Sequence, residues 1–285
     1  MPSPAEPTSP VPSPDDGSDA GPSNLVLRIV SALVLAPVAL VCVWQGDLWF
    51  SSFIAIVVLA ASGEWRTMAG LKHRGVGTLL IMAPFFVLIA AQAAGVTPAM
   101  FALLIGLGLA VASFGSSWRE RSWVFVGMAH LGVATLALFF LRTQPDIGRD
   151  LVIFVFALVW LSDTGGYAAG RTFGGPKLAP RISPNKTWSG AAGALVLTSA
   201  GAAIFANFTA LEIETVLPIA VLISIATQLG DIFESWVKRY FDVKDSGNLI
   251  PGHGGVLDRI DGVLFAAPVL ALYVLLNGLE FIQWR

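Results

Sequence analysis

The chain contains little charge and almost no cysteine. Asp, Glu, Lys and Arg make up 13% of its 285 residues, and Cys42 is the single cysteine. One cysteine excludes an internal disulfide and any metal or redox site built on several thiolates. We interpret Cys42 as a small apolar residue in a membrane span. The formal net charge of −2 says little by itself, and we expect no nucleic-acid partner.

Apolar residues dominate the composition. They fill 55% of the chain, and the mean hydropathy is +0.74, values that do not fit a soluble domain of this length. The sequence therefore predicts an all-α fold, a polytopic transmembrane helical bundle. Nine apolar runs approach the length of about 20 residues that a bilayer requires. They cover residues 25–45, 48–63, 76–94, 98–115, 123–141, 150–170, 188–207, 215–234 and 261–280. One short hairpin among the early runs could be re-entrant instead.

The first residues differ sharply from the rest. Residues 1–23 are rich in Pro, Ser and acidic side chains, with too little apolar surface to offset the entropy of ordering, so we expect a disordered tail. An acidic tail followed by a run long enough to span is not typical of a secretory signal. Residues 24–149 are expected to form N-terminal transmembrane helices. Residues 150–285 are expected to form a catalytic transmembrane region with cytoplasmic loops at 171–187 and 235–260.

Basic residues indicate the orientation. With nine spans, fourteen of the seventeen Lys and Arg residues fall on one side, and the other side holds only Arg142, Arg149 and Arg285. Because cytoplasmic loops carry the excess of Lys and Arg, the tail and both long loops should face the cytoplasm. We predict an integral protein of the cell (inner) membrane with its active site on the cytoplasmic side.

Carboxylates gather at the ends of the last two apolar runs. Thr227, Asp231 and Glu234 are spaced i, i+4 and i+7, which places them on one helical stripe. Asp258 and Asp261 stand at i and i+3 near the start of the last run, so they project to the same side. An ionisable group near hydrocarbon costs about 2.5–3.5 kcal/mol on insertion scales and is a functional candidate by default.

The chemistry of these carboxylates suits a hard cation. Asp231, Asp258 and Asp261 would supply oxygen ligands for Mg²⁺, which completes its octahedron with water and substrate phosphates. A second cation is left open. The alternative is a surface ion-pair network, which we favour less because Asp258 and Asp261 are near a helix N-terminus that already attracts anions.

A glycine-rich turn lies between the two runs. Residues 251–255 read Pro-Gly-His-Gly-Gly, and the glycines, including Gly254 and Gly255, permit positive φ angles and a close backbone approach. Exposed amides in such a turn can cradle phosphate oxygens. His253 could be a proton carrier, a phosphate donor or simply a turn residue.

Further charges flank these groups. Lys238, Arg239 and Lys244 could be membrane-surface anchors, but beside the carboxylates and the glycine turn we favour a polyphosphate clamp. Asp163 lies roughly two helical turns inside the cytoplasmic end of its run. It could hold an interhelical contact or belong to the site, in which case the loops after residues 170 and 234 converge in space.

These residues carry a resemblance. The stretch from Ser235 to Asp261 resembles the signature of the phosphatidate cytidylyltransferase (CDP-diacylglycerol synthase) family. A second segment, from Asp163 to Gly190, is similar to the family's other cytoplasmic region. The family usually has Lys where Asn185 stands and often Glu where Ser189 stands. The matching residues of the first stretch are Ser235, Lys238, Arg239, Lys244, Asp245, the turn at 251–255, Asp258, Arg259 and Asp261.

The resemblance implies transfer of a cytidylyl group from CTP to phosphatidic acid, giving CDP-diacylglycerol and pyrophosphate for phospholipid synthesis. It also implies roles. Lys186, Lys238 and Lys244 would bind the leaving phosphates and Arg259 the phosphatidate head group, while Asp163, Ser183 and Asn185 would position the nucleotide. A homodimer is suggested by the resemblance only. The implied catalytic residues are Asp231, Lys244, Asp245, Asp258, Arg259 and Asp261, and the implied substrate-binding residues are Asp163, Ser183, Asn185, Lys186, Lys238, Arg239, His253, Gly254 and Gly255.

Other functions can be weighed against the same pattern. A polyprenol kinase or an isoprenoid-lipid cytidylyltransferase could use a similar site. A transporter also has buried carboxylates and broken helices, but the chain shows no internal repeat and its charges lie at one face. CDP-alcohol phosphotransferases have a different aspartate spacing, with an Ala-Arg pair after the first Asp-Gly.

Overall fold

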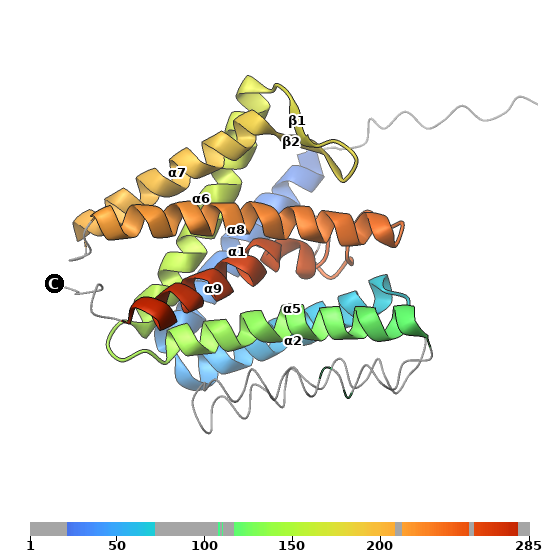
Figure 1. Ribbon diagram of the computed structural model, residues 1–285, viewed down its shortest axis with the longest axis horizontal. Coiled ribbons are helices and arrows are strands. Elements are labelled where there is room, and N and C mark those ends of the chain that lie inside the picture. The colour runs from blue at the N-terminus through green and yellow to red at the C-terminus, as the bar shows by residue number, and fades with distance from the viewer. Residues whose placement is uncertain are drawn as a thin grey trace, which may run out of the picture.

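The computed structural model describes residues 22–71, 108, 110, 117–208, 213–250 and 254–278 as a bundle of long helices with one small hairpin (Figure 1). The helices form from long apolar runs, three of which contain an internal proline: Pro37, Pro218 and Pro268. In chain order the elements are α1 (Pro22–Gln45), α2 (Asp47–Met68), α5 (Trp118–Arg142), α6 (Gly148–Phe173), β1 (Lys177–Ala179), β2 (Ser183–Thr187), α7 (Trp188–Phe208), α8 (Ile213–Tyr240) and α9 (Leu257–Asn277).

The all-α membrane architecture is confirmed. Within the described residues, the six helices α2 and α5 to α9 are long and apolar enough to cross a membrane. The predicted spans at 76–94 and 98–115 lie outside the described residues except for residues 108 and 110, so the count of nine remains a prediction. The antiparallel β1–β2 hairpin, which pairs Lys177 with Thr187 and Ala179 with Ser183, is an addition that the sequence did not indicate.

The charged connections meet at one end of the bundle, here called the charged end: the C-termini of α2 and α8, the N-termini of α5 and α9, and the hairpin (Figure 1). Two contacts tie it together. Trp65 Nε1 of α2 donates to the carbonyl of Trp123 in α5 at 3.0 Å, and Arg239 Nε of α8 reaches the carbonyl of Ile182 in the hairpin at 3.4 Å. At the opposite end the guanidinium of Arg149 stacks 4.1 Å above the ring of Trp44.

Glycines bring α6 and α7 into backbone contact. A Cβ added to Gly193 would lie 2.2 Å from the Cβ of Ala169, and one added to Gly165 would lie 2.5 Å from the Gly193 carbonyl oxygen. Small residues at such a crossing maximise van der Waals contact between membrane helices, where no hydrophobic force drives association. The crossing fixes the part of α6 that carries Asp163 beside the start of α7, and thus beside the hairpin that precedes it.

A second close crossing joins α8 and α9. A Cβ on Gly230 would lie 2.4 Å from the Asp261 carbonyl oxygen, and one on Gly262 would lie 2.8 Å from Thr227 Cγ2. The residues next to these glycines are Asp231 and Asp261. The helix pairing therefore brings the two carboxylates to the same place.

The α6–α7 contact gives a testable prediction for stability. Gly193→Ala should lower the free energy of unfolding by about 1–3 kcal/mol, because the added methyl group overpacks a contact that cannot relax without separating two helices. The measurement is the thermal unfolding midpoint of the purified protein in detergent. The matched control is Gly63→Ala in α2, where a Cβ would meet nothing within 4 Å. An unchanged midpoint for Gly193→Ala would contradict the close crossing.

Candidate active site

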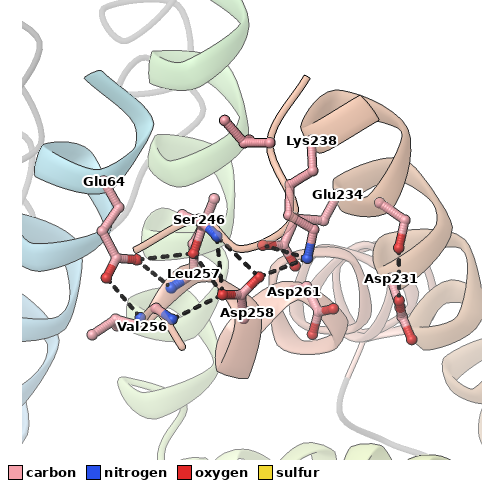
Figure 2. A network of polar contacts seen from close by, with 12 residues as sticks. Glu64, Asp231, Glu234, Lys238, Ser246, Val256, Leu257, Asp258 and Asp261 are labelled. Carbon is pink, nitrogen blue, oxygen red and sulfur yellow. Dashed lines mark hydrogen bonds and ion pairs between the residues drawn. The ribbon is translucent and has the colours of Figure 1, made fainter. Parts of the chain in front are cut away.

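Four acidic side chains from α8 and α9 form a row at the charged end. In Figure 2, Glu234 and Asp261 lie between Asp258 on one side and Asp231 on the other. The predicted stripe of α8 faces α9, since Thr227 packs on Gly262 and Glu234 is buried. The row thus arises from helical periodicity together with the Gly230 and Gly262 crossing.

Asp231 is paired with the hairpin. Its Oδ2 lies 2.5 Å from Lys186 Nζ, and its Oδ1 accepts from Ser235 Oγ at 3.3 Å. The Asp231 side chain is 39% exposed, so it remains open to solvent or substrate. This pair confirms that the two loops converge, because Lys186 belongs to the first and Asp231 stands at the edge of the second.

Asp258 is the most completely bound of these carboxylates. Its side chain is only 7% exposed, and Oδ1 accepts from Lys238 Nζ at 2.6 Å. Oδ2 accepts from the Ser246 amide at 3.1 Å, the Ser246 hydroxyl at 3.0 Å and the Gly255 amide at 2.8 Å. The position of Asp258 is therefore fixed by the loop as well as by α8.

Glu234 and Asp261 have fewer hydrogen-bond partners than Asp258. Glu234 is 2% exposed, and its carboxylate oxygens accept no hydrogen bond in the described part of the chain; Lys238 Nζ stands 3.6 Å away. Asp261 Oδ1 accepts from the amide of Gly262 at 2.7 Å. Glu234 and Asp261 are close enough to interact electrostatically. Taken with Asp231 and Asp258, they place four carboxyl groups beside the two ammonium groups of Lys186 and Lys238.

Asp163 faces the same group from α6. It is exposed, and Asp231, Asp261, Lys186 and Arg259 are the charges that act on it most strongly. Its interpretation as part of the site is thus supported by proximity. The neighbouring Ser162 takes the structural role instead, since its hydroxyl lies 3.1 Å from the Ser224 hydroxyl in the buried α6–α8 contact.

The remaining predicted residues lie around this row. Ser183 and Asn185 are on β2, while Lys244 and Asp245 are exposed in the loop between α8 and α9. Arg259 is exposed in the first turn of α9, and Arg239 contacts the hairpin carbonyl described above. His253, with Pro251 and Gly252, lies outside the described residues.

The glycines of the turn approach the chain's own side chains. Gly254 has φ +83°, and a Cβ there would lie 2.9 Å from Asp258 Oδ2; one on Gly255 would lie 2.0 Å from Ser246 Oγ. Because the Gly255 amide donates to Asp258, this donor is directed at a protein carboxylate. The close backbone approach predicted from the glycines exists, and its partners here are Asp258 and Ser246.

Sequence reasoning missed Glu64. This residue of α2 is 5% exposed and accepts hydrogen bonds from the amides of Val256 and Leu257, at the start of α9 (Figure 2). The available signal was a single acid late in an apolar helix, which is a functional candidate by default. Glu234, which was assigned to the polar stripe but to no catalytic role, also belongs to the site, since it lies between Asp231 and Asp258.

The described residues contain no group of three or more His, Cys, Asp or Glu side chains arranged closely enough to hold a metal ion. Asp231 and Asp258 are each bound by a lysine instead. The side chains nevertheless fit a hard cation, because their ligand atoms are carboxylate oxygens and because Asp231 and Asp258 already bind positively charged groups.

Known proteins resemble this chain over most of its length. The model of the Cytidylyltransferase family matches residues 26–277. The phosphatidate cytidylyltransferase of Brucella suis biovar 1 (strain 1330) is 39% identical over 261 residues, which cover 88% of this chain and 93% of that protein. The phosphatidate cytidylyltransferase of Staphylococcus aureus (strain COL) is 32% identical over 260 residues, covering 87% and 98%. On this match and on the carboxylate and lysine site that the helices assemble, the chain belongs to the cytidylyltransferase family.

Proposed function

We propose that this protein transfers the cytidylyl group of CTP to phosphatidic acid, forming CDP-diacylglycerol and releasing pyrophosphate for phospholipid synthesis. One observation carries the proposal: in a chain related throughout to phosphatidate cytidylyltransferases, acidic groups of α8 and α9 meet Lys186 and Lys238 at one end of a membrane bundle. That location suits a reaction between a water-soluble nucleotide and a lipid that keeps its acyl chains in the bilayer.

The reaction requires two anions to approach each other. The nucleophile is a phosphate oxygen of phosphatidic acid, which is already ionised at neutral pH, so no strong general base is needed. It attacks the α-phosphorus of CTP; the new P–O bond forms as the bond to the β-phosphate oxygen breaks, and pyrophosphate leaves with the electron pair. The protein's contribution is positive charge and orientation.

Asp231, Asp258 and Asp261 would hold Mg²⁺, with a second cation left open. The support is their position in one row and the surplus of carboxylates over ammonium groups there. When bound, a divalent ion would neutralise negative charge at the α-phosphate. Lys186 and Lys238 form ion pairs with Asp231 and Asp258 in this structure. Each lysine would exchange this aspartate for a substrate phosphate.

The other roles follow from position. Lys244 is exposed in the loop between α8 and α9, and it would bind the departing β- and γ-phosphates together with Lys186 and Lys238. Arg259 would bind the phosphatidate phosphate, since its planar fork suits bidentate contact. The β2 residues and Asp163 would position the nucleotide. The homodimer suggested by the resemblance also remains a prediction.

The membrane orientation belongs to the same proposal. Most of the described basic side chains lie at the charged end, while Arg142 and Arg149 lie at the other. By the excess of Lys and Arg in cytoplasmic loops, the charged end faces the cytoplasm of a cell (inner) membrane, where CTP is available.

Labelled CTP tests the reaction. Purified protein with Mg²⁺, phosphatidic acid and [α-³²P]CTP should yield labelled lipid and free pyrophosphate, whereas [γ-³²P]CTP should leave the lipid unlabelled. Label from the γ position would indicate a kinase, and preference for an isoprenoid phosphate over phosphatidic acid would indicate a different cytidylyltransferase. Asp231→Asn and Asp258→Asn should each reduce lipid labelling by about a hundredfold or more, because charge stabilisation of the transition state is lost.

The control for these variants is Asp146→Asn, an exposed acid at the opposite end whose positive φ Asn tolerates. Its labelling should match the unmodified protein. All variants are compared at equal amounts of monodisperse protein. Full labelling by both Asp231→Asn and Asp258→Asn would remove the proposed cation ligands.

Kinetic constants separate the two anion contacts. Lys244→Ala should raise KM for CTP by about tenfold and leave KM for phosphatidic acid nearly unchanged, since one charge-assisted hydrogen bond contributes about 1.5–3 kcal/mol. Arg259→Ala should show the opposite pattern. Steady-state rates with each substrate varied in turn decide between them, and an inverted pair of results would overturn this division of roles.

Cysteine labelling tests the orientation. Because Cys42 is the only cysteine, Cys42→Ser provides a background without thiols. In that background, Arg181→Cys in the hairpin should react with a membrane-impermeant maleimide only in inverted vesicles or lysed cells. Thr143→Cys, after α5, should react from the outer face of spheroplasts. Reaction of Arg181→Cys from the outer face would contradict the proposed orientation.

A further inference from the structure

Glu64 replaces the missing cap of α9. Glu64 Oε1 accepts from the Val256 amide at 2.9 Å and Oε2 from the Leu257 amide at 2.8 Å, although 192 and 193 residues separate the partners. The first amides of a helix have no partner within the helix and need a capping acceptor. Val256, the residue before α9, provides no side-chain hydrogen bond. The carboxylate charge of Glu64 is also favoured there by the positive end of the helix dipole.

The loop before α9 is built around this carboxylate. A Cβ on Gly247 would lie 2.6 Å from Glu64 Oε1, and a Cβ on Gly255 would lie 2.6 Å from Glu64 Oε2. Any side chain at either position would therefore displace Glu64. Gly255, which belongs to the turn predicted to bind phosphate, and Gly247 thus make room for a buried carboxylate from α2.

Ser246 links Glu64 to Asp258. Its hydroxyl lies 3.2 Å from Glu64 Oε2 and 3.0 Å from Asp258 Oδ2, and one hydroxyl hydrogen can serve only one of them at a time (Figure 2). The Ser246 and Gly255 amides donate to Asp258 as well. The two carboxylates thus share the Ser246 hydroxyl and accept from neighbouring amides, Gly255 for Asp258 and Val256 for Glu64, so a movement of Glu64 would disturb the donors that fix Asp258.

Asp258 in turn holds Lys238, at 2.6 Å. The first turn of α9 carries Arg259 and leads to Asp261, so the direction of this turn sets the position of several proposed site residues at once. Glu64 is a contact from α2 that binds the backbone of this turn, beside the contacts that Lys238 and Ser246 make with the Asp258 side chain.

We propose that Glu64 is a positioning residue for the reaction: by capping α9 and sharing Ser246 with Asp258, it holds the Asp258, Arg259 and Asp261 side chains in register with α8. This inference rests on the proposed function. Glu64 itself need not contact either substrate. The N-terminal helices would then contribute directly to the geometry of the site.

The test is Glu64→Gln, which keeps the size of the side chain but replaces one acceptor oxygen with a donor facing the α9 amides. Turnover (kcat) should fall by about a hundredfold, as expected for a displacement of catalytic groups by about 1 Å. KM for CTP should change less than KM for phosphatidic acid, because Arg259, the proposed phosphatidate contact, stands in the displaced turn. Ser246→Ala, which removes only the link, should lower kcat in the same direction by a smaller factor.

Hydrogen–deuterium exchange supplies a readout independent of activity. The amides of residues 255–257 should exchange faster in Glu64→Gln than in the unmodified protein, while the α6–α7 contact exchanges at the same rate. A variant that merely unfolds would exchange faster throughout. The matched control is Glu214→Gln, the same change at an exposed acid in the first turn of α8, for which both kcat and exchange should be unchanged.

Two results would overturn the proposal. One is a Glu64→Gln protein with kcat within about twofold of the unmodified enzyme. The other is unchanged exchange at residues 255–257, whatever the activity. If the unmodified protein produced no CDP-diacylglycerol, the proposed function would fail, but exchange would still decide whether Glu64 holds the turn.

Discussion

The candidate site depends on the close approach of α8 and α9. Gly230 and Gly262 bring the backbones into contact, and each is followed or preceded by an aspartate that the crossing directs into the row. Side chains larger than hydrogen at these glycines would separate the helices and move Asp231 away from Asp261. Because ionisable groups are expensive near hydrocarbon, such a row is tolerable only at a helix end where loop amides, ammonium groups or water can reach it.

Charge balance explains why the site can be both stable and reactive. In this structure the outer carboxylates, Asp231 and Asp258, are balanced by Lys186 and Lys238. Breaking a partly buried pair by removing one partner costs more than the pair contributes, because the other charge is left uncompensated. In the proposed reaction a substrate phosphate would replace the carboxylate at each lysine, and the proposed cation would compensate the carboxylates that are released. Each lysine would then keep a charge-assisted hydrogen bond, to its aspartate in the free protein and to a phosphate in the complex.

Local patterns predicted part of this arrangement. The stripe through Thr227, Asp231 and Glu234 follows from the helical period. The convergence of the two loops is predicted because polar residues enter the helices next to both loops, and the Lys186–Asp231 pair shows it. The hairpin was not predictable, because the sequence Ser-Pro-Asn-Lys-Thr lacks the alternation that marks a strand. The partners of the glycine turn were also hidden. Glu64 binds backbone amides far away in the chain, and an amide carries no side-chain signature that sequence can show.

The contacts of α2 show why the site crosses the boundary between residues 24–149 and 150–285. The neighbour of Glu64, Trp65, is fully buried over Gly127 and donates to the Trp123 carbonyl. Adjacent residues of one helix thus bind α9 through a carboxylate and α5 through an indole. A slip of α2 by one turn, about 5.4 Å, would break both contacts and leave a charged carboxylate without its amides. The packing of Trp65 therefore sets the depth at which Glu64 meets α9, and an apolar core contact determines the geometry of a polar site.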